Sequence, residues 1–145
     1  MKNKEFADLL KEDLGFSGGQ QQQRAIDLFP ALVRQSHLEE WQPGQDMARS
    51  ASQVVWIGVA IYSILELEML DALEEKLSRE TRAEKIYAFN VSTFRDFADF
   101  ERVLPGIGKV YQTPVVGFWT NGVLEVKLWG AAARDYVKSR FNLPS

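Results

Sequence analysis

Apolar and polar positions form their clearest pattern in the last third of the chain, where two apolar runs flank Asn121-Gly122. The runs are Val115–Trp119 and Val123–Trp129, and Pro114 comes just before the first. Asn-Gly is the preferred pair for a two-residue hairpin turn, because both turn positions need a positive φ. The pattern therefore predicts an antiparallel hairpin. Its register predicts one apolar face, on which Trp119 opposes Leu124, Gly117 opposes Val126 and Val115 opposes Leu128. The other face is predicted to be mixed and open to water, with Thr120 opposite Val123, Phe118 opposite Glu125 and Val116 opposite Lys127.

Two further apolar runs enclose a long helical pattern in the middle of the chain. Gln53–Ala60 and Lys85–Val91 are nearly continuous apolar runs, which are typical of strands covered on both faces. A helix is predicted between them, from Tyr62 or Ser63 to Arg79, and the three elements form a βαβ unit with a right-handed crossover. The inward stripe of this helix is Met69, Leu70, Leu73 and Leu77, and its acids Glu66, Glu68, Asp71, Glu74 and Glu75 are interpreted as a solvated face.

The remaining segments predict shorter helices. The amphipathic helix Lys2–Leu14 either packs on its own domain, pairs with a second copy or serves as a docking arm. A second apolar stripe starts at Ala25 and meets Pro30, which would kink or end the helix, and residues 31–35 fit a short strand equally well. Further helices are predicted over Ser36–Trp41, over Ser92–Arg102 with Ser92 or Thr93 as its cap, and over Ala131–Phe141, which would bury Ala132, Tyr136 and Val137.

Composition narrows the class of protein. A chain of 145 residues is expected to form one domain that buries roughly two thirds of its unfolded surface. Its net charge of −3 gives no reason to expect nucleic acid or a membrane as a partner. No apolar stretch reaches about 18 residues, and Met1–Asp13 lacks the apolar core of a signal peptide. The cytoplasm is therefore the expected location.

The chain has no cysteine, and this absence excludes several kinds of chemistry. Disulfides, thiol catalysis, thiolate metal sites and iron–sulfur ligation all need a cysteine. The single histidine, His37, stands next to Leu38 and two glutamates and is interpreted as a surface residue. No metal site, Ser–His relay or cofactor is therefore expected.

The order of predicted elements resembles the thioredoxin fold. Trp56, four residues before the region of the long helix, resembles the tryptophan of the Trp-x-x-x-Cys-x-x-Cys motif of thioredoxins. Asn90 ends the next strand, as an asparagine does in thioredoxins. Thr113-Pro114 lies where the family keeps a cis Xaa-Pro bond, and Gly130 precedes the last helix. The resemblance covers roughly residues 31–141. It implies an α/β fold with a mixed central sheet flanked by helices, in which residues 1–30 are an N-terminal helical extension and 31–145 the thioredoxin-like domain.

The chain departs from this family at the redox centre. Counted from Trp56, the two cysteines would fall at Ala60 and Ser63, and the buried acid of the family would fall at Val54. Thiol–disulfide exchange proceeds by thiolate attack on sulfur, so it is excluded here. Some glutathione transferases, on a related fold, use Ser or Tyr at such a place, and Ser63 or Tyr62 would be the equivalent in a small enzyme of that type. The alternative is that Ser63 caps the helix, with Glu66 completing a Ser-x-x-Glu box.

The resemblance also implies a binding groove. In this family the cis-proline loop lies beside the active turn and leaves the preceding backbone free to pair with an extended peptide. The alternative is that the proline serves folding only. The groove would consist of Trp56, Ala60, Ile61, Tyr62, Ser63, Gln112, Thr113 and Pro114, with Ile61 and Tyr62 exposed. The expected function is a redox-inactive adaptor or specialised chaperone that binds a protein or extended peptide, with no catalytic residue. An oligomeric structural component, assembled through the N-terminal helix, is the further alternative.

Overall fold

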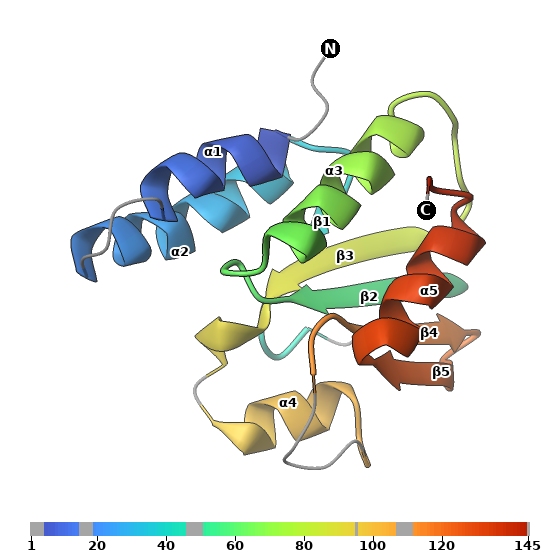
Figure 1. Ribbon diagram of the computed structural model, residues 1–145. Helices are drawn as coiled ribbons and strands as arrows, with labels where there is room; N and C mark the ends of the chain where they lie inside the picture. The colour runs from blue at the N-terminus through green and yellow to red at the C-terminus, as the bar shows by residue number, and fades with distance from the viewer. Residues whose placement is uncertain (1–4, 15–18, 46–50, 95, 107–111, 145) are drawn as a thin grey trace.

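A computed structural model of the chain describes residues 5–14, 19–45, 51–94, 96–106 and 112–144. A five-stranded mixed sheet with the order β1-β3-β2-β4-β5 lies at its centre (Figure 1). The strands are β1 (Glu39–Glu40), β2 (Gln53–Val59), β3 (Lys85–Asn90), β4 (Val115–Thr120) and β5 (Val123–Trp129). The helices are α1 (Glu5–Leu14), α2 (Gly19–Arg34), α3 (Ile64–Leu77), α4 (Phe97–Val103) and α5 (Gly130–Arg140), and η2 (Val91–Thr93) is a short 3-10 helix.

The predicted βαβ unit is present. β2 and β3 pair in parallel, from Val54 opposite Lys85 to Val59 opposite Asn90, and α3 connects them. β1 adds a second parallel pair on the outer side of β3, while β4 pairs antiparallel with β2 and β5 antiparallel with β4. The expected fold class, a mixed sheet flanked by helices, is therefore confirmed.

Helices cover both faces of the sheet. α1, α2, α3 and α5 lie on one face, and α4 lies on the other (Figure 1). Along β2, Val55, Ile57 and Val59 join the apolar cluster on the α3 side, while Val54 and Trp56 join the cluster on the α4 side. Both faces of this strand are buried, which explains its unbroken apolar run. None of the helices in the described segments combines the length and the apolar character that crossing a bilayer requires.

The N-terminal helix α1 packs on the rest of the chain. Phe6 and Leu10 are buried in the cluster that α2 and α3 also form, and Leu9 is partly exposed. The carboxylate of Asp71, in the middle of α3, accepts hydrogen bonds from the backbone N–H groups of Phe6 at 2.6 Å and Ala7 at 3.0 Å. It thereby satisfies N–H groups that the first turn of a helix leaves without partners. Asp71 is buried, so its assignment to a solvated face is wrong.

The segment before β2 differs from its predicted structure. α2 continues through Pro30 to Arg34, so the strand alternative over residues 31–35 is wrong, and position 30 lies inside a helix. The loss of one backbone hydrogen bond at a proline is offset by burial of Phe29 and Val33 in the cluster on the α3 side. The predicted helix Ser36–Trp41 is also wrong, because Glu39–Glu40 pair with β3 instead. Pairing with a strand distant in sequence overrides the local helical signal.

The two C-terminal helices begin and face differently from the prediction. Asp96 caps α4 by accepting a hydrogen bond from Asp99 N–H, whereas Ser92 and Thr93 lie in η2. In α5, Ala133 is buried and Ala132 is exposed. The helix starts at Gly130, one residue before its predicted start, and its buried face includes Ala133 and Val137. The predicted burial of Ala132 is therefore wrong.

The hairpin has the predicted register only next to its turn. Thr120 opposes Val123 and Trp119 opposes Leu124, as predicted. Beyond these pairs Glu125 has no opposite residue, so β5 carries a β-bulge. The remaining observed pairs are Phe118 with Val126, Gly117 with Lys127, Val116 with Leu128 and Val115 with Trp129.

The bulge changes which side chains share a face. Leu124 packs in the cluster on the α4 side, whereas Val126 and Leu128 pack against the cluster on the α3 side. Phe118 and Val116 also belong to the cluster on the α3 side and are buried. The predicted mixed face open to water is therefore wrong, because α5 covers this side of β4 (Figure 1).

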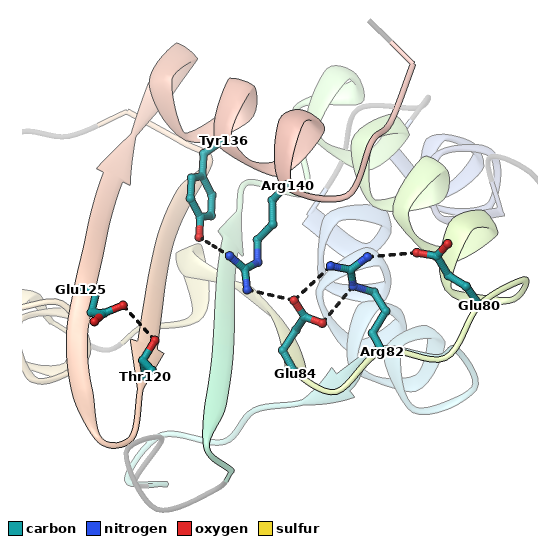
Figure 2. Close-up of polar contacts among 7 residues, drawn as sticks. All are labelled: Glu80, Arg82, Glu84, Thr120, Glu125, Tyr136 and Arg140. Atoms are coloured by element: carbon teal, nitrogen blue, oxygen red, sulfur yellow. Dashed lines mark hydrogen bonds and ion pairs between the residues drawn. The ribbon is translucent and has the colours of Figure 1, made fainter.

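A cluster of charged side chains joins the end of α5 to the start of β3 (Figure 2). Glu84 accepts hydrogen bonds from Nε of Arg82 and Nη2 of Arg140, each at 2.9 Å. Burial alone would raise the pKa of Glu84, but the hydrogen bonds and charge of Arg82, with a hydrogen bond from Arg140, hold that pKa below its ordinary value. The hydrogen bond to Glu84 in turn raises the pKa of Arg82. The guanidinium of Arg140 also lies 4.1 Å from the ring centre of Phe118.

Candidate functional site

The turn between β2 and α3 lies beside the loop before β4. β2 and β4 pair antiparallel up to Gly58 opposite Val115, which brings the residues that follow β2 close to those that precede β4. The turn spans residues 60–63 and is closed by a hydrogen bond from Ser63 N–H to the Ala60 carbonyl at 3.0 Å. In the loop, the Thr113-Pro114 peptide bond is cis. The structure thus brings together the two segments of the predicted groove.

One buried carboxylate connects these two segments. Oε1 of Glu66 accepts a hydrogen bond from the backbone N–H of Ala60 at 2.8 Å. Its Oε2 accepts a hydrogen bond from the hydroxyl of Thr113 at 2.7 Å. Glu66 is only 4% exposed, so its assignment to a solvated face is wrong. The carboxylate fixes the position of the cis-proline loop against the start of α3.

The local sequence explains the direction of this side chain. Ser63 is the N-cap of α3, and its Oγ accepts a hydrogen bond from Glu66 N–H at 3.4 Å. In a capping box the glutamate would accept the N–H of Ser63, but that N–H is already bonded to the Ala60 carbonyl. The carboxylate reaches the N–H of Ala60 instead. Capping by Ser63 is therefore confirmed. The Ser-x-x-Glu spacing was the one feature of the sequence that could have indicated an inward-pointing Glu66. No feature of the sequence indicated its contact with Thr113.

The predicted groove residues differ in their accessibility. Ala60, Ser63 and Thr113 are partly exposed, Tyr62 and Gln112 are exposed, and Trp56, Ile61 and Pro114 are buried. Ile61 was expected at the surface, but it packs in the cluster on the α3 side and has no exposed area. Trp56 projects from the opposite face of the sheet, where its ring centre lies 5.6 Å from that of Trp41. Neither Ile61 nor Trp56 has a surface for a partner.

An exposed apolar surface remains at the start of α3. Tyr62 is 49% exposed, and Leu65, in the first turn of the helix, is 63% exposed. Sequence reasoning missed Leu65, because its position next to the predicted inward stripe gave no sign that it faces water. Tyr62 lies within the turn that Glu66 connects to the cis-proline loop, and Leu65 lies in the first turn of the helix that follows it.

Thr113 presents an open backbone edge beside this surface. The carbonyl oxygens on either side of it, those of Gln112 and Pro114, both accept hydrogen bonds from Gly130 N–H, at 3.2 Å and 2.9 Å. Thr113 itself makes no backbone hydrogen bond to any residue that the structure describes. Thr113 is partly exposed.

The chemical groups at this site are hydrogen-bonding groups and apolar surface. The hydroxyl of Ser63 is engaged as a helix cap. His37 lies away from the site, near the other end of α3, with its Nδ1 2.7 Å from Oε2 of Glu74. The chain contains no thiol, so thiol–disulfide exchange has no nucleophile here. The arrangement is suited to holding a peptide backbone.

No protein-family model matches this chain, and none of the curated proteins does. Among solved structures, it is similar to a chain from work on the thiol-resolving mechanism of yeast mitochondrial 1-Cys peroxiredoxin, with 15% identity and a TM-score of 0.51 over 72% of this chain and 98% of that one. A mutant thioredoxin from Halobacterium salinarum is 16% identical, with a TM-score of 0.45 over 76% and 96% of the two chains. Human ERp44 is 14% identical, with a TM-score of 0.49, and the match covers 72% of this chain but only 29% of ERp44.

These likenesses concern the fold. Together with the strand order β1-β3-β2-β4-β5, the match with a TM-score of 0.51 shows that the chain has the thioredoxin-like fold, and it carries this fold without any cysteine.

Proposed function

We propose that this thioredoxin-like chain is a redox-inactive adaptor or chaperone that binds an extended peptide segment of a protein partner. The observation that carries the proposal is the open backbone of Thr113 beside an exposed apolar surface. A peptide that adds a strand at this edge gains main-chain hydrogen bonds from Thr113. Tyr62 and Leu65 supply apolar contacts for its side chains.

The buried contacts around Glu66 support this role. A binding edge is most effective when it is held in place before the ligand arrives, because less order must then be created on binding. Glu66 holds the Thr113 side chain and the Ala60 backbone at the same time, and Gly130 holds the backbone on both sides of Thr113. The open edge is therefore preorganised for binding.

The proposal is tested by selecting peptides from a displayed random library on the immobilised chain. The affinity of a selected peptide is then measured by titration for the wild type, for Tyr62→Asp and for the matched control Val123→Asp. Val123 is 61% exposed at the far hairpin turn. Tyr62→Asp is expected to weaken binding by about tenfold or more, because exposed aromatic residues often dominate peptide contacts, and Val123→Asp is expected to leave it unchanged.

Nuclear magnetic resonance locates the bound peptide directly. The amide resonance of Thr113 is expected to shift on binding, because its N–H pairs with the peptide. Selected peptides that bind Tyr62→Asp as tightly as the wild type and leave the Thr113 resonance unmoved would overturn the proposal. Ile61 is unsuitable for a charged variant, because a charge at this buried position would unfold the domain.

A further inference from the structure

A groove of about 640 Å³ runs between α3 and α5. Leu65 and Met69 line it from α3, Arg134 and Lys138 line it from α5, and Leu143 contributes from the segment after α5. The two residues on each helix are four positions apart, so each pair forms a continuous stripe along one helix face. The groove therefore has an apolar stripe, with Glu68 beside it, on the α3 side and a cationic stripe on the α5 side. Its volume lies within the range of roughly 300–1,000 Å³ that is typical of ligand sites.

The groove is continuous with the proposed peptide site. It begins at Leu65, in the first turn of α3, directly after the turn 60–63. On its other side α5 begins at Gly130, whose N–H is bonded to the carbonyl of Pro114. A peptide paired with Thr113, in the loop before β4, thus lies next to the two helix starts that border this groove.

The two cations in the groove have no acidic partner among the residues that the structure describes. Arg134 and Lys138 make neither an ion pair nor a side-chain hydrogen bond there, and Glu68, which also lines the groove, already has an interaction of its own. Other arginines are paired with acids: Arg34 with Glu40, Arg79 with Glu75, Arg82 with Glu84, Arg102 with Asp99, and Arg140 with Glu84. In a chain of net charge −3, two neighbouring cations that line one groove without an acidic partner favour a negatively charged occupant.

We infer that the groove receives the continuation of the peptide that pairs with Thr113, and that this continuation carries an apolar side chain together with acidic residues. The inference rests on the proposed function. The apolar side chain would pack on Leu65, Met69 and Leu143, and the carboxylates would face Arg134 and Lys138. The groove therefore determines which peptide sequences the chain prefers. Strand pairing through the backbone alone does not provide such selectivity.

The test uses a library-selected peptide extended at either end with a glutamate tail or, as the matched ligand, a glutamine tail. The wild type is expected to bind the glutamate-tailed peptide about tenfold more tightly at low salt, and added salt is expected to reduce the difference. Arg134→Glu combined with Lys138→Glu is expected to abolish or reverse this preference. The control, Arg34→Glu combined with Arg102→Glu, makes the same change of charge at exposed arginines on α2 and α4 and is expected to retain it.

The Thr113 amide resonance separates this inference from the proposed function. If both tailed peptides shift this resonance but bind with equal affinity, the inference is overturned and the proposed function stands. If the glutamate tail binds through Arg134 and Lys138 while the Thr113 resonance stays unmoved, the groove binds acidic peptides on its own and the proposed function fails. A preference that the control variant loses as well would show a general effect of net charge, which overturns the inference.

Discussion

The hydroxyl of Thr113 donates a 2.7 Å hydrogen bond to the buried carboxylate of Glu66, across 47 positions of sequence. The other oxygen of that carboxylate accepts the N–H of Ala60, at the position where the resemblance to thioredoxins would place the first redox cysteine. A side chain of α3 therefore connects the turn over residues 60–63 to the cis-proline loop. The scaffold keeps these two segments together by hydrogen bonds, in a chain without cysteine.

Replacing Glu66 with alanine is expected to destabilise the fold by about 2–4 kcal/mol, because it leaves two donors without their buried acceptor. Thr113→Val removes only one of the two hydrogen bonds, and its expected cost is about 1 kcal/mol. Urea denaturation measures both values. In the double variant the two effects are expected to be non-additive by about 0.5–3 kcal/mol, and simple additivity would contradict a direct contact.

The acidic side chains of α3 make contacts that the sequence does not reveal, because their partners are backbone N–H groups of other segments. Glu66, Asp71 and Glu74 each accept a hydrogen bond from backbone N–H of another segment: Glu66 from Ala60, Asp71 from Phe6 and Ala7, and Glu74 from His37. Apolar periodicity identified Met69, Leu70 and Leu73 as buried, because that stripe follows from side-chain types alone, but it left out the buried Leu67 and included Leu77, which is only partly buried. Every residue except proline carries a backbone N–H, so no pattern of residue types marks such a partner.

Replacing Asp71 with alanine is expected to loosen α1 from α3. The variant removes the acceptor for Phe6 and Ala7 N–H at the start of α1, and the loss of a helix cap costs about 0.5–2 kcal/mol. Hydrogen exchange followed residue by residue is expected to show faster exchange of α1 amides than in the wild type. Asp135→Ala, at an exposed position on α5, is the control. Equal protection of α1 in both variants would show that the apolar contacts of Phe6 and Leu10 hold the helix alone.

The cluster around Glu84 predicts a dependence of stability on pH. The folded-state pKa of Glu84 lies below its ordinary value of 4.5, so this group stabilises the fold at a pH above its unfolded pKa. That contribution is lost as the pH falls through the lower, folded pKa. Denaturation of the wild type and Glu84→Gln is expected to give a difference in unfolding free energy that is largest at neutral pH and shrinks in acid. A difference that stays constant down to acid pH would contradict the role of the charge.

Local pattern predicted the hairpin turn but not the bulge that follows it. Asn121-Gly122 determines the turn through its own backbone preferences, and the pairs next to it form as predicted. Strict alternation then placed Leu124, Val126 and Leu128 on one face. The structure needs apolar side chains from β5 on both faces, because the clusters on the α3 side and the α4 side both extend to this edge strand. The extra residue Glu125 meets that need, which arises from packing and not from the strand itself.

This account of the bulge predicts unequal effects for two single-residue deletions in β5. Deleting Glu125 removes the residue without an opposite partner, so all observed pairs and the face of every side chain are preserved. Deleting Lys127 removes a paired residue, so either Val126 must move to the α4 side or Leu128 and Trp129 must change faces. Both deletions remove an exposed charged residue from the same strand, which makes them matched. Thermal and urea denaturation are expected to show near-normal stability without Glu125 and a clear loss without Lys127, because only the second deletion takes buried apolar area away from the core. Equal losses would show that the bulge itself, through the local twist it gives the strand, is required for the fold.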